Sequence, residues 1–251
     1  MRSSKKFTKT YLSKLPISFI ILILLFAGAV YLFASIVDEV IWEKEDELDH
    51  SIFQFLATYI RSDRLTNVME GVSFFASATF LQISYTLLAV YYLIFKDYKR
   101  TIEIAFIGTG GFLINYLMKN FFQRPRPLDP LTEPLHNFSF PSGHATSAFI
   151  FYGLLVYLLW KSKVNNRLKY ISSFILISFA LLIGFSRIYL RLHYPSDVIA
   201  GFCAGFSWLC FSVWLFVFLK KRSDKESHSQ ENTAHSNKPI TNTNHRNDPA
   251  S

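Results

Sequence analysis

The sequence is divided into apolar blocks of about 20 residues, the length that an α-helix needs to cross the hydrocarbon core of a bilayer. The first block, PISFIILILLFAGAVYLFASIV, covers residues 16–37 and contains no charged side chain. Further blocks cover residues 72–95, 102–117, 145–160, 170–185 and 198–219. Because a lipid-embedded chain must satisfy its backbone hydrogen bonds internally, we expect an all-α integral membrane bundle of six transmembrane helices.

The first block has an alternative interpretation as the core of a cleavable signal peptide, since AGA at residues 27–29 resembles a cleavage site. A signal core is only about 7–15 residues long, whereas this apolar run is longer and continues beyond that site. We therefore expect a retained span.

A short interfacial helix should follow this span, at residues 48–60, either on the membrane surface or covering other helices. Its apolar positions at helical spacing are Leu48, Ile52, Phe55, Leu56 and Tyr59.

Charges at the ends of the blocks predict the orientation of the chain. Residues 1–14 are basic and contain no acidic side chain, and the segments after the second, fourth and sixth blocks are basic as well. By the positive-inside rule these segments face the cytoplasm, so both termini do as well.

The chain then divides into a basic cytoplasmic N-terminus (1–14), a six-span domain (15–222) and a polar tail (223–251). We expect the tail to be disordered because it has too few apolar residues for a core.

The net charge of +8 would also suit a nucleic-acid-binding protein. The basic residues, however, gather just beyond the apolar blocks, which is typical of membrane-flanking charge. We therefore expect a bilayer and no nucleic acid as partner, in a multi-pass protein of a plasma (inner) membrane. Cys203 and Cys210 lie inside one apolar block, at a spacing that fits neither a zinc site nor a disulfide.

Three polar clusters lie at block ends on the predicted outer face. They are KNFFQRPRP at 119–127, FPSGHATS at 140–147 and SRIYLRLHYPSD at 186–197. Any one of them could be an interfacial anchor, because Lys and Arg side chains extend toward the lipid headgroups. Three clusters on one face, with two histidines and an aspartate among them, favour a functional site instead.

The side chains of these clusters are suited to binding phosphate. Lys119, Arg126 and Arg187 offer three cations, and the planar fork of arginine matches phosphate oxygens. Ser142 and Gly143 precede an apolar helix, whose first backbone N–H groups form a ready anion site. We therefore predict that these five residues bind a phosphoryl group.

Two histidines are candidates for the chemistry. His193 is the predicted nucleophile, and Asp197 can accept a hydrogen bond from one of its ring nitrogens, which leaves the other free to attack. His144 would protonate the leaving oxygen as general acid. The same side chains could in principle ligate zinc. Three neighbouring cations would oppose a divalent metal, so we expect neither a metal nor another cofactor.

These residues resemble the three signature motifs of the type 2 phosphatidic acid phosphatase superfamily. The matching pieces are Lys119-x6-Arg126-Pro127, Pro141-Ser142-Gly143-His144 and Ser186-Arg187-x5-His193-x3-Asp197. The resemblance covers about residues 70–220, and the six spans agree with the membrane branch of the family. It implies a metal-independent phosphatase that forms a phosphohistidine at His193, with the other residues in the roles given above.

The resemblance implies a lipid substrate, whose chains stay in the bilayer while the headgroup enters the site. The candidates are phosphatidylglycerophosphate, phosphatidic acid, diacylglycerol pyrophosphate and undecaprenyl diphosphate. One alternative is a haloperoxidase-like oxidoreductase with bound vanadate, against which the six spans argue. The other is a non-catalytic lipid-binding or lipid-transport protein, against which the full set of His, Asp and cationic residues argues.

Several features lie outside the motifs. The run GTGG at 108–111 is inside the third block and lacks a P-loop lysine, which favours close helix packing. Arg124 and Arg191 could either touch a headgroup or anchor at the interface. Asn115 lies one turn before Lys119 and could support it.

Overall fold

The computed structural model describes residues 17–236 of the 251-residue chain, and all regular structure in this part is helical. The predicted N-terminus 1–14 lies outside the described residues. The elements in chain order are α2 (Ile17–Val37), the π-helix η1 (Asp38–Glu43), α3 (Glu47–Tyr59), α4 (Asp63–Phe74), α5 (Ala78–Ile94), α6 (Tyr98–Phe122), α7 (Gly143–Lys161), α8 (Asn166–Tyr189) and α9 (Pro195–Ser236).

Within this part of the chain, six helical segments are long and apolar enough to cross a membrane, as predicted. They are Ile20–Glu43, Asp63–Ile94, Tyr98–Phe122, Gly143–Lys161, Asn166–Tyr189 and Pro195–Arg222. Most helices extend past the apolar blocks into polar sequence, since backbone hydrogen bonds can continue where water replaces lipid. As a result Lys119 and Arg187 lie in the last turns of α6 and α8.

The second span is interrupted between α4 and α5. The break follows Phe74, and Ser77 caps α5 by accepting a hydrogen bond from the N–H of Phe80 at 3.3 Å. A serine at such a cap satisfies a backbone donor that has no partner within the helix.

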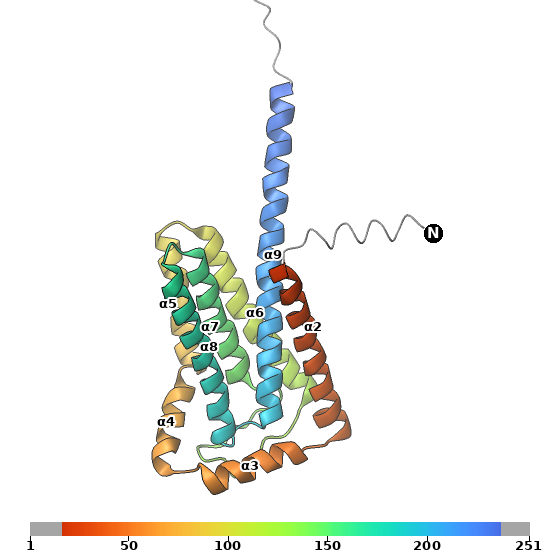
Figure 1. The fold of residues 1–251 in the computed structure, drawn as a ribbon, viewed down its shortest axis with the longest axis vertical. Helices are drawn as coiled ribbons and strands as arrows, with labels where there is room; N and C mark the ends of the chain where they lie inside the picture. The colour runs from red at the N-terminus through yellow and green to blue at the C-terminus, as the bar shows by residue number, and fades with distance from the viewer. Residues whose placement is uncertain (1–16, 237–251) are drawn as a thin grey trace, which may run out of the picture. The chain divides into compact units, whose positions relative to one another are not determined.

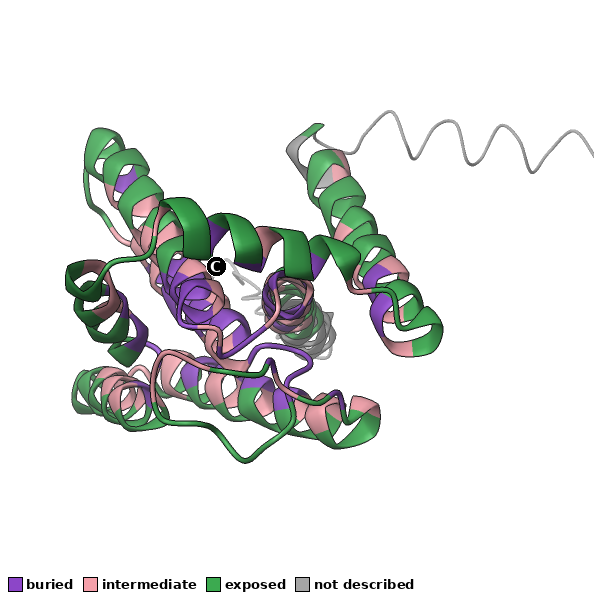
Figure 2. Cartoon of the chain, turned by 90° about the horizontal axis from the view of Figure 1, so that it is seen from below, coloured by how far each residue is buried: buried purple, intermediate pink, exposed green. Residues whose placement is uncertain are grey.

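The helices of residues 17–212 form one unit in which α7 packs against α6 and α8, α5 packs on α6, and α4 on α8 (Figure 1). Buried residues lie where these helices face one another, whereas the outward sides are exposed (Figure 2). The largest apolar cluster joins α5, α7 and α8 through Leu81, Phe151 and Ile183. The exposed sides are rich in apolar residues, which suits contact with lipid.

Two glycines allow α9 to approach the backbone of α7. A Cβ on Gly201 would lie 2.8 Å from the carbonyl oxygen of Ser142, and one on Gly205 would lie 2.8 Å from that of Thr146. Small residues four apart commonly permit such close helix approach in membranes. The two helix N-termini are thereby held together, and the N–H of Ser142 donates to the carbonyl oxygen of Asp197 at 3.0 Å.

The GTGG run has the packing role predicted for it. A Cβ on Gly110 would lie 2.2 Å from the ring of Trp208, and one on Gly111 would lie 2.6 Å from Ile150. Trp208 is fixed there because its indole N–H donates to the carbonyl oxygen of Ile107 at 2.9 Å.

Helix α3 is the predicted short helix after the first span, but its buried face differs from the one expected. The buried residues are Asp49, Phe53 and Leu56. An apolar pattern cannot identify this face, because one of its members is a carboxylate that is buried only where tertiary partners satisfy it. The expected apolar positions that are exposed instead are Leu48, Phe55 and Tyr59.

Helix α9 continues past Arg222 to Ser236, into the segment 223–251 for which the sequence predicts disorder. Extending an existing helix costs far less than nucleating one, so a polar sequence can continue the apolar span. Residues 237–251 lie outside the described residues.

We expect Gly205→Ala to destabilise the protein, because the added methyl group would meet a backbone carbonyl that cannot move without shifting α7. Overpacking of this kind costs about 1–3 kcal/mol. The apparent melting temperature of the purified protein in detergent should therefore fall. The control is Gly71→Ala, because Gly71 is exposed within α4 and a methyl group added there would have no neighbour within 4 Å. Equal melting temperatures for the two variants would contradict the close approach of α7 and α9.

Candidate active site

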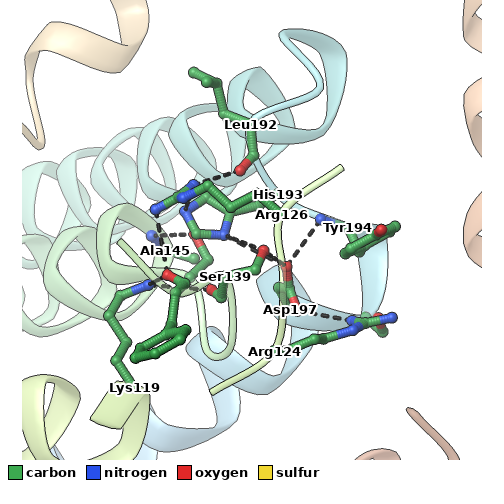
Figure 3. A network of polar contacts seen from close by, with 12 residues as sticks. Lys119, Arg124, Arg126, Ser139, Ala145, Leu192, His193, Tyr194 and Asp197 are labelled. Atoms are coloured by element: carbon green, nitrogen blue, oxygen red, sulfur yellow. Dashed lines mark hydrogen bonds and ion pairs between the residues drawn. The ribbon is translucent and has the colours of Figure 1, made fainter. Parts of the chain in front are cut away.

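The three polar clusters of the sequence meet at one end of the helical unit, where α6 and α8 end and α7 and α9 begin. Helix α3 runs across this end (Figure 1). Figure 3 shows the polar network that joins Lys119, Arg126, His193 and Asp197. The network draws on α6, the loop that follows it, the turn after α8 and the first turn of α9.

The imidazole of His193 is at the centre of this network and only 1% exposed. Its Nε2 lies 3.2 Å from Nη1 of Arg126, and its Nδ1 lies 3.4 Å from Oδ2 of Asp197. The hydroxyl of Ser139 is 3.3 Å from the same Nδ1. A guanidinium can only donate hydrogen bonds, so Nε2 must accept and the ring proton belongs on Nδ1. The unprotonated nitrogen therefore faces Arg126.

The surroundings of His193 favour its neutral form. Burial lowers the pKa of His193 well below its ordinary value of 6.5, and the charges of Lys119, Arg126 and Arg187 lower this pKa further. Burial also lowers the pKa of Arg126, to about 10, so this guanidinium is still charged at neutral pH. The site thus combines a neutral imidazole with fixed positive charge.

The carboxylate of Asp197 is fully buried and accepts from several donors. Its Oδ1 accepts from Nη1 of Arg124 at 2.7 Å. Its Oδ2 accepts from the N–H of Tyr194 at 2.9 Å and from the hydroxyl of Ser139, and faces His193. These donors offset the cost of burying the charge and fix the plane of the carboxylate.

Two cationic side chains near His193, Lys119 at the end of α6 and Arg126 in the loop that follows it, donate hydrogen bonds to backbone carbonyl oxygens. Nζ of Lys119 donates to Phe138 at 2.6 Å and to Ser139 at 3.1 Å. Arg126 donates through Nε to Asn137 at 2.7 Å and through Nη1 to Leu192 at 2.5 Å. Carbonyl oxygens carry no net charge, so neither side chain is held by an ion pair with a described carboxylate.

Arg187 is a third cation of this kind. It is 5% exposed, donates through Nη1 to the hydroxyl of Ser73 at 2.5 Å, and its Nε has no partner in the described part of the chain. Among the side chains that the structure describes, at residues 17 and 20–222, no carboxylate lies within salt-bridge distance of Lys119, Arg126 or Arg187. Three cationic side chains without such a partner around a buried imidazole are suited to an anionic ligand.

The second cluster forms the N-terminus of α7. Ser142 is the N-cap and accepts from the N–H of Ala145 at 3.4 Å. A Cβ on Gly143 would lie 3.1 Å from Oδ1 of Asn115, so a larger side chain would crowd this corner. His144 is half-buried in the first turn and interacts electrostatically with its neighbours in the site. Those neighbours are Arg187, His193, Arg126 and Lys119.

The structure shows what is contacted by Asn115, Arg124 and Arg191, the residues near the motifs whose roles the sequence left open. Asn115 donates to the hydroxyl of Thr146 at 3.2 Å, so it joins α6 to α7 and makes no hydrogen bond to Lys119. Arg191 lies over the ring of Phe53, 5.3 Å from its centroid. Arg124 is buried in the network, which excludes the role of a simple interfacial anchor. Among the side chains that the structure describes, none of which lies beyond Arg222, no group of three or more His, Cys, Asp or Glu could hold a metal ion.

Sequence reasoning missed several polar residues that complete the site. They are single serines, one asparagine and one aspartate that no spacing marks, and most of them lie far from the motifs or in loops. Two are close to a motif, since Ser139 precedes the second cluster and Ser196 lies between His193 and Asp197. These residues are Asp49, Ser73, Asn137, Ser139 and Ser196.

Comparison with known proteins gives consistent matches. The model of the PAP2 superfamily matches residues 100–221. Phosphatidylglycerophosphatase B of Bacillus subtilis (strain 168) is 30% identical over 155 residues, which are 59% of this chain and 74% of that protein. Undecaprenyl-diphosphatase BcrC of the same organism is 30% identical over 130 residues, which are 48% of this chain and 62% of that protein.

A solved structure matches as well, with a TM-score of 0.65 and 26% identity, over 80% of this chain and 96% of the other. It is the crystal structure of the first transmembrane PAP2 type phosphatidylglycerolphosphate phosphatase from Bacillus subtilis. The helical architecture, the three motifs at one end of the bundle and these matches together identify the chain as a member of the PAP2 superfamily, a multi-pass membrane protein with the helical fold of that family.

Proposed function

We propose that this protein is a lipid phosphatase that hydrolyses a phosphomonoester or diphosphate lipid through a phosphohistidine intermediate. One observation carries the proposal: the unprotonated Nε2 of His193 faces Arg126 at 3.2 Å, within a group of cations that no described carboxylate neutralises. Such a group attracts a phosphate to the atom that can attack it. The names of the relatives, which are lipid phosphatases, support the same reaction class.

In the first step, the lone pair on Nε2 of His193 attacks phosphorus, and the bond from phosphorus to the leaving oxygen breaks. His144 donates a proton to that oxygen, which leaves as the alcohol or as the lipid monophosphate. The imidazole gains positive charge, and Asp197 stabilises it by accepting the hydrogen bond from Nδ1. For in-line displacement the two histidines must lie on opposite sides of the phosphorus.

In the second step, water attacks the phosphohistidine. His144, now neutral, accepts a proton from this water, and the phosphorus–nitrogen bond breaks. Its electron pair returns to Nε2 of His193, inorganic phosphate leaves, and both histidines regain their starting forms. The protons and electrons therefore balance over one turnover without a metal ion.

The cations and the N-terminus of α7 would bind the non-bridging oxygens throughout. Lys119, Arg126 and Arg187 supply positive charge, and the hydroxyl of Ser142 and the backbone N–H of Gly143 supply donors at a helix N-terminus. The N–H of Ser142 is not among these donors, because it donates to the carbonyl oxygen of Asp197. Charge on the non-bridging oxygens is greatest in the transition state, so donors fixed beforehand lower its free energy. We propose that this arrangement replaces the charge stabilisation that a divalent ion gives other phosphatases.

We propose that the substrate is one of four lipids: phosphatidylglycerophosphate, phosphatidic acid, diacylglycerol pyrophosphate or undecaprenyl diphosphate. The two Bacillus relatives favour the first and the last of these.

We also propose that the site opens on the outer face of the plasma membrane, with the basic termini on the inner face, because the loop between α7 and α8 at the opposite end is basic.

Replacing His193 with Ala should reduce phosphate release from all four lipids to background, because the attacking atom is lost. His144→Ala should lower turnover by about 10²–10⁴-fold, the usual contribution of a general acid. Phosphate release by the purified variants is the measurement. The matched control is His136→Ala, since His136 is exposed in the loop before α7 and should be dispensable. Normal release by a folded His193→Ala variant would rule out the assigned nucleophile.

Orthovanadate should inhibit phosphate release, because it resembles the transition state and would bind the same cations. A chelator should leave the rate unchanged. Loss of activity with chelator that a divalent ion restores would refute metal independence. Oxidation of bromide by added hydrogen peroxide in the presence of the vanadate-treated protein, without any phosphate release from lipids, would favour the haloperoxidase-like alternative.

The orientation of the site can be tested with one introduced thiol. A membrane-impermeant maleimide added to intact cells should label His136→Cys, because the loop before α7 lies at the site end of the bundle. Lys163→Cys, at the opposite end between α7 and α8, should react only after the cells are permeabilised. The native Cys203 is buried, and Cys210 is half-buried and should be replaced by Ala in both variants. The reverse labelling pattern would place the site on the cytoplasmic face.

A further inference from the structure

Arg124 lies behind the predicted site and is tied to two carboxylates. It is 7% exposed, and its Nη1 lies 2.7 Å from Oδ1 of Asp197 while its Nη2 lies 2.9 Å from Oδ2 of Asp49. The same Nη1 donates to the hydroxyl of Ser196 at 2.8 Å. The ring of Tyr194 lies over its guanidinium carbon at 4.1 Å from the ring centroid. Figure 3 shows Arg124 and Tyr194 on the side of Asp197 away from Lys119.

Asp49 brings helix α3 into this network. It is 3% exposed, and its Oδ1 accepts from the N–H of Ser196 at 2.9 Å while its Oδ2 accepts from the hydroxyl of Ser196 at 2.5 Å. A carboxylate is buried at this depth only when charge and hydrogen bonds compensate it. Helix α3 is thereby fixed to the first turn of α9, next to Asp197.

The electrostatic setting of Arg124 separates it from the three cations of the site. Burial alone would lower the pKa of Arg124, but Asp197 and Asp49 outweigh this effect and raise it above the ordinary value. Its charge is therefore permanent and compensated by two carboxylates. A side chain in this setting has no uncompensated charge for a phosphate and acts instead on its neighbours.

We infer that Arg124 and Asp49 are positioning residues for the proposed reaction, forming a buried relay Asp49–Arg124–Asp197–His193 that orients the carboxylate of Asp197 and sets the proton affinity of His193. This inference rests on the proposed function. Arg124 fixes Oδ1, so Oδ2 is directed toward Nδ1 of the imidazole. Its positive charge also weakens the pull of Asp197 on a proton at His193, and Asp49 balances part of that charge.

The relay predicts opposite effects for its two members. Without the cation of Arg124, Asp197 would stabilise protonated His193 more strongly, so the pKa of His193 would rise. Without the anion of Asp49, the charge of Arg124 would be less balanced, so the pKa of His193 would fall. The remaining charged or titratable groups around His193 stay in place in both variants. They are Lys119, Arg126, His144, Arg187, Tyr194 and Asp197.

The test compares Arg124→Gln and Asp49→Asn with wild type by phosphate release in detergent micelles over a range of pH. The acid limb of kcat/KM reports the free enzyme, where protonated His193 cannot attack. We expect this limb to move to higher pH in Arg124→Gln and to lower pH in Asp49→Asn. We also expect kcat to fall at least tenfold in Arg124→Gln while KM changes by less than threefold, because the residue does not touch phosphate.

Matched controls separate the relay from a general charge effect or a folding defect. Arg64→Gln and Glu47→Gln remove the same charges from exposed positions on α4 and α3 and should leave the limb unmoved. Arg124→Lys keeps the charge but lacks the fork that reaches two carboxylates, so it should keep the limb near wild type while kcat falls. Shifts in the same direction for Arg124→Gln and Asp49→Asn, or no shift in either, would overturn the inference, as would a change in KM alone.

A readout that needs no turnover keeps the two proposals apart. The pKa of His193 can be followed by NMR of protein with ¹³C-labelled histidine, with the signal assigned through His193→Ala. Opposite shifts of this pKa in the two relay variants support the relay even if wild type releases no phosphate from the four lipids, a result that would reject the proposed function alone. Unchanged pKa values in an active enzyme would reject the relay alone.

Discussion

The buried carboxylate of Asp197 is the interaction on which the rest of the site depends. Its side chain accepts from Arg124, Ser139 and the backbone of Tyr194 and faces His193, while its carbonyl oxygen accepts from the N–H of Ser142. One residue thus contacts all three polar clusters of the sequence. Because a buried charge is costly unless its partners are in place, this carboxylate also fixes the loops that carry them.

Helix packing determines where that carboxylate lies. Gly201 and Gly205 let α9 approach α7 until a Cβ at either position would meet a backbone carbonyl. The close approach places the first turn of α9 beside the N-cap of α7, so the anion-binding end of one helix adjoins the aspartate of the other. The apolar interior of the bundle is therefore part of the reason that the polar end has a defined geometry.

Charge is divided into two zones at this end of the protein. Lys119, Arg126 and Arg187 are bound by neutral acceptors and have no ion-pair partner among the described side chains. Arg124 lies behind Asp197 and is compensated by it and by Asp49. The first zone is suited to contact with a phosphate, and the second to holding the imidazole partner in place. The boundary between the zones is the imidazole ring of His193.

The sequence by itself determined the membrane class, the six helices and the motif residues, because span length, flanking charge and the spacing of ionisable residues are local properties. Only the tertiary structure decided that Asp49 of α3 is buried against Arg124, and that Ser139 and Ser73 contact the site. These contacts join residues that are 58 to 114 positions apart in the chain. A polar side chain gives no local signal of whether water or a distant partner will satisfy it, so its role is settled only when the helices pack.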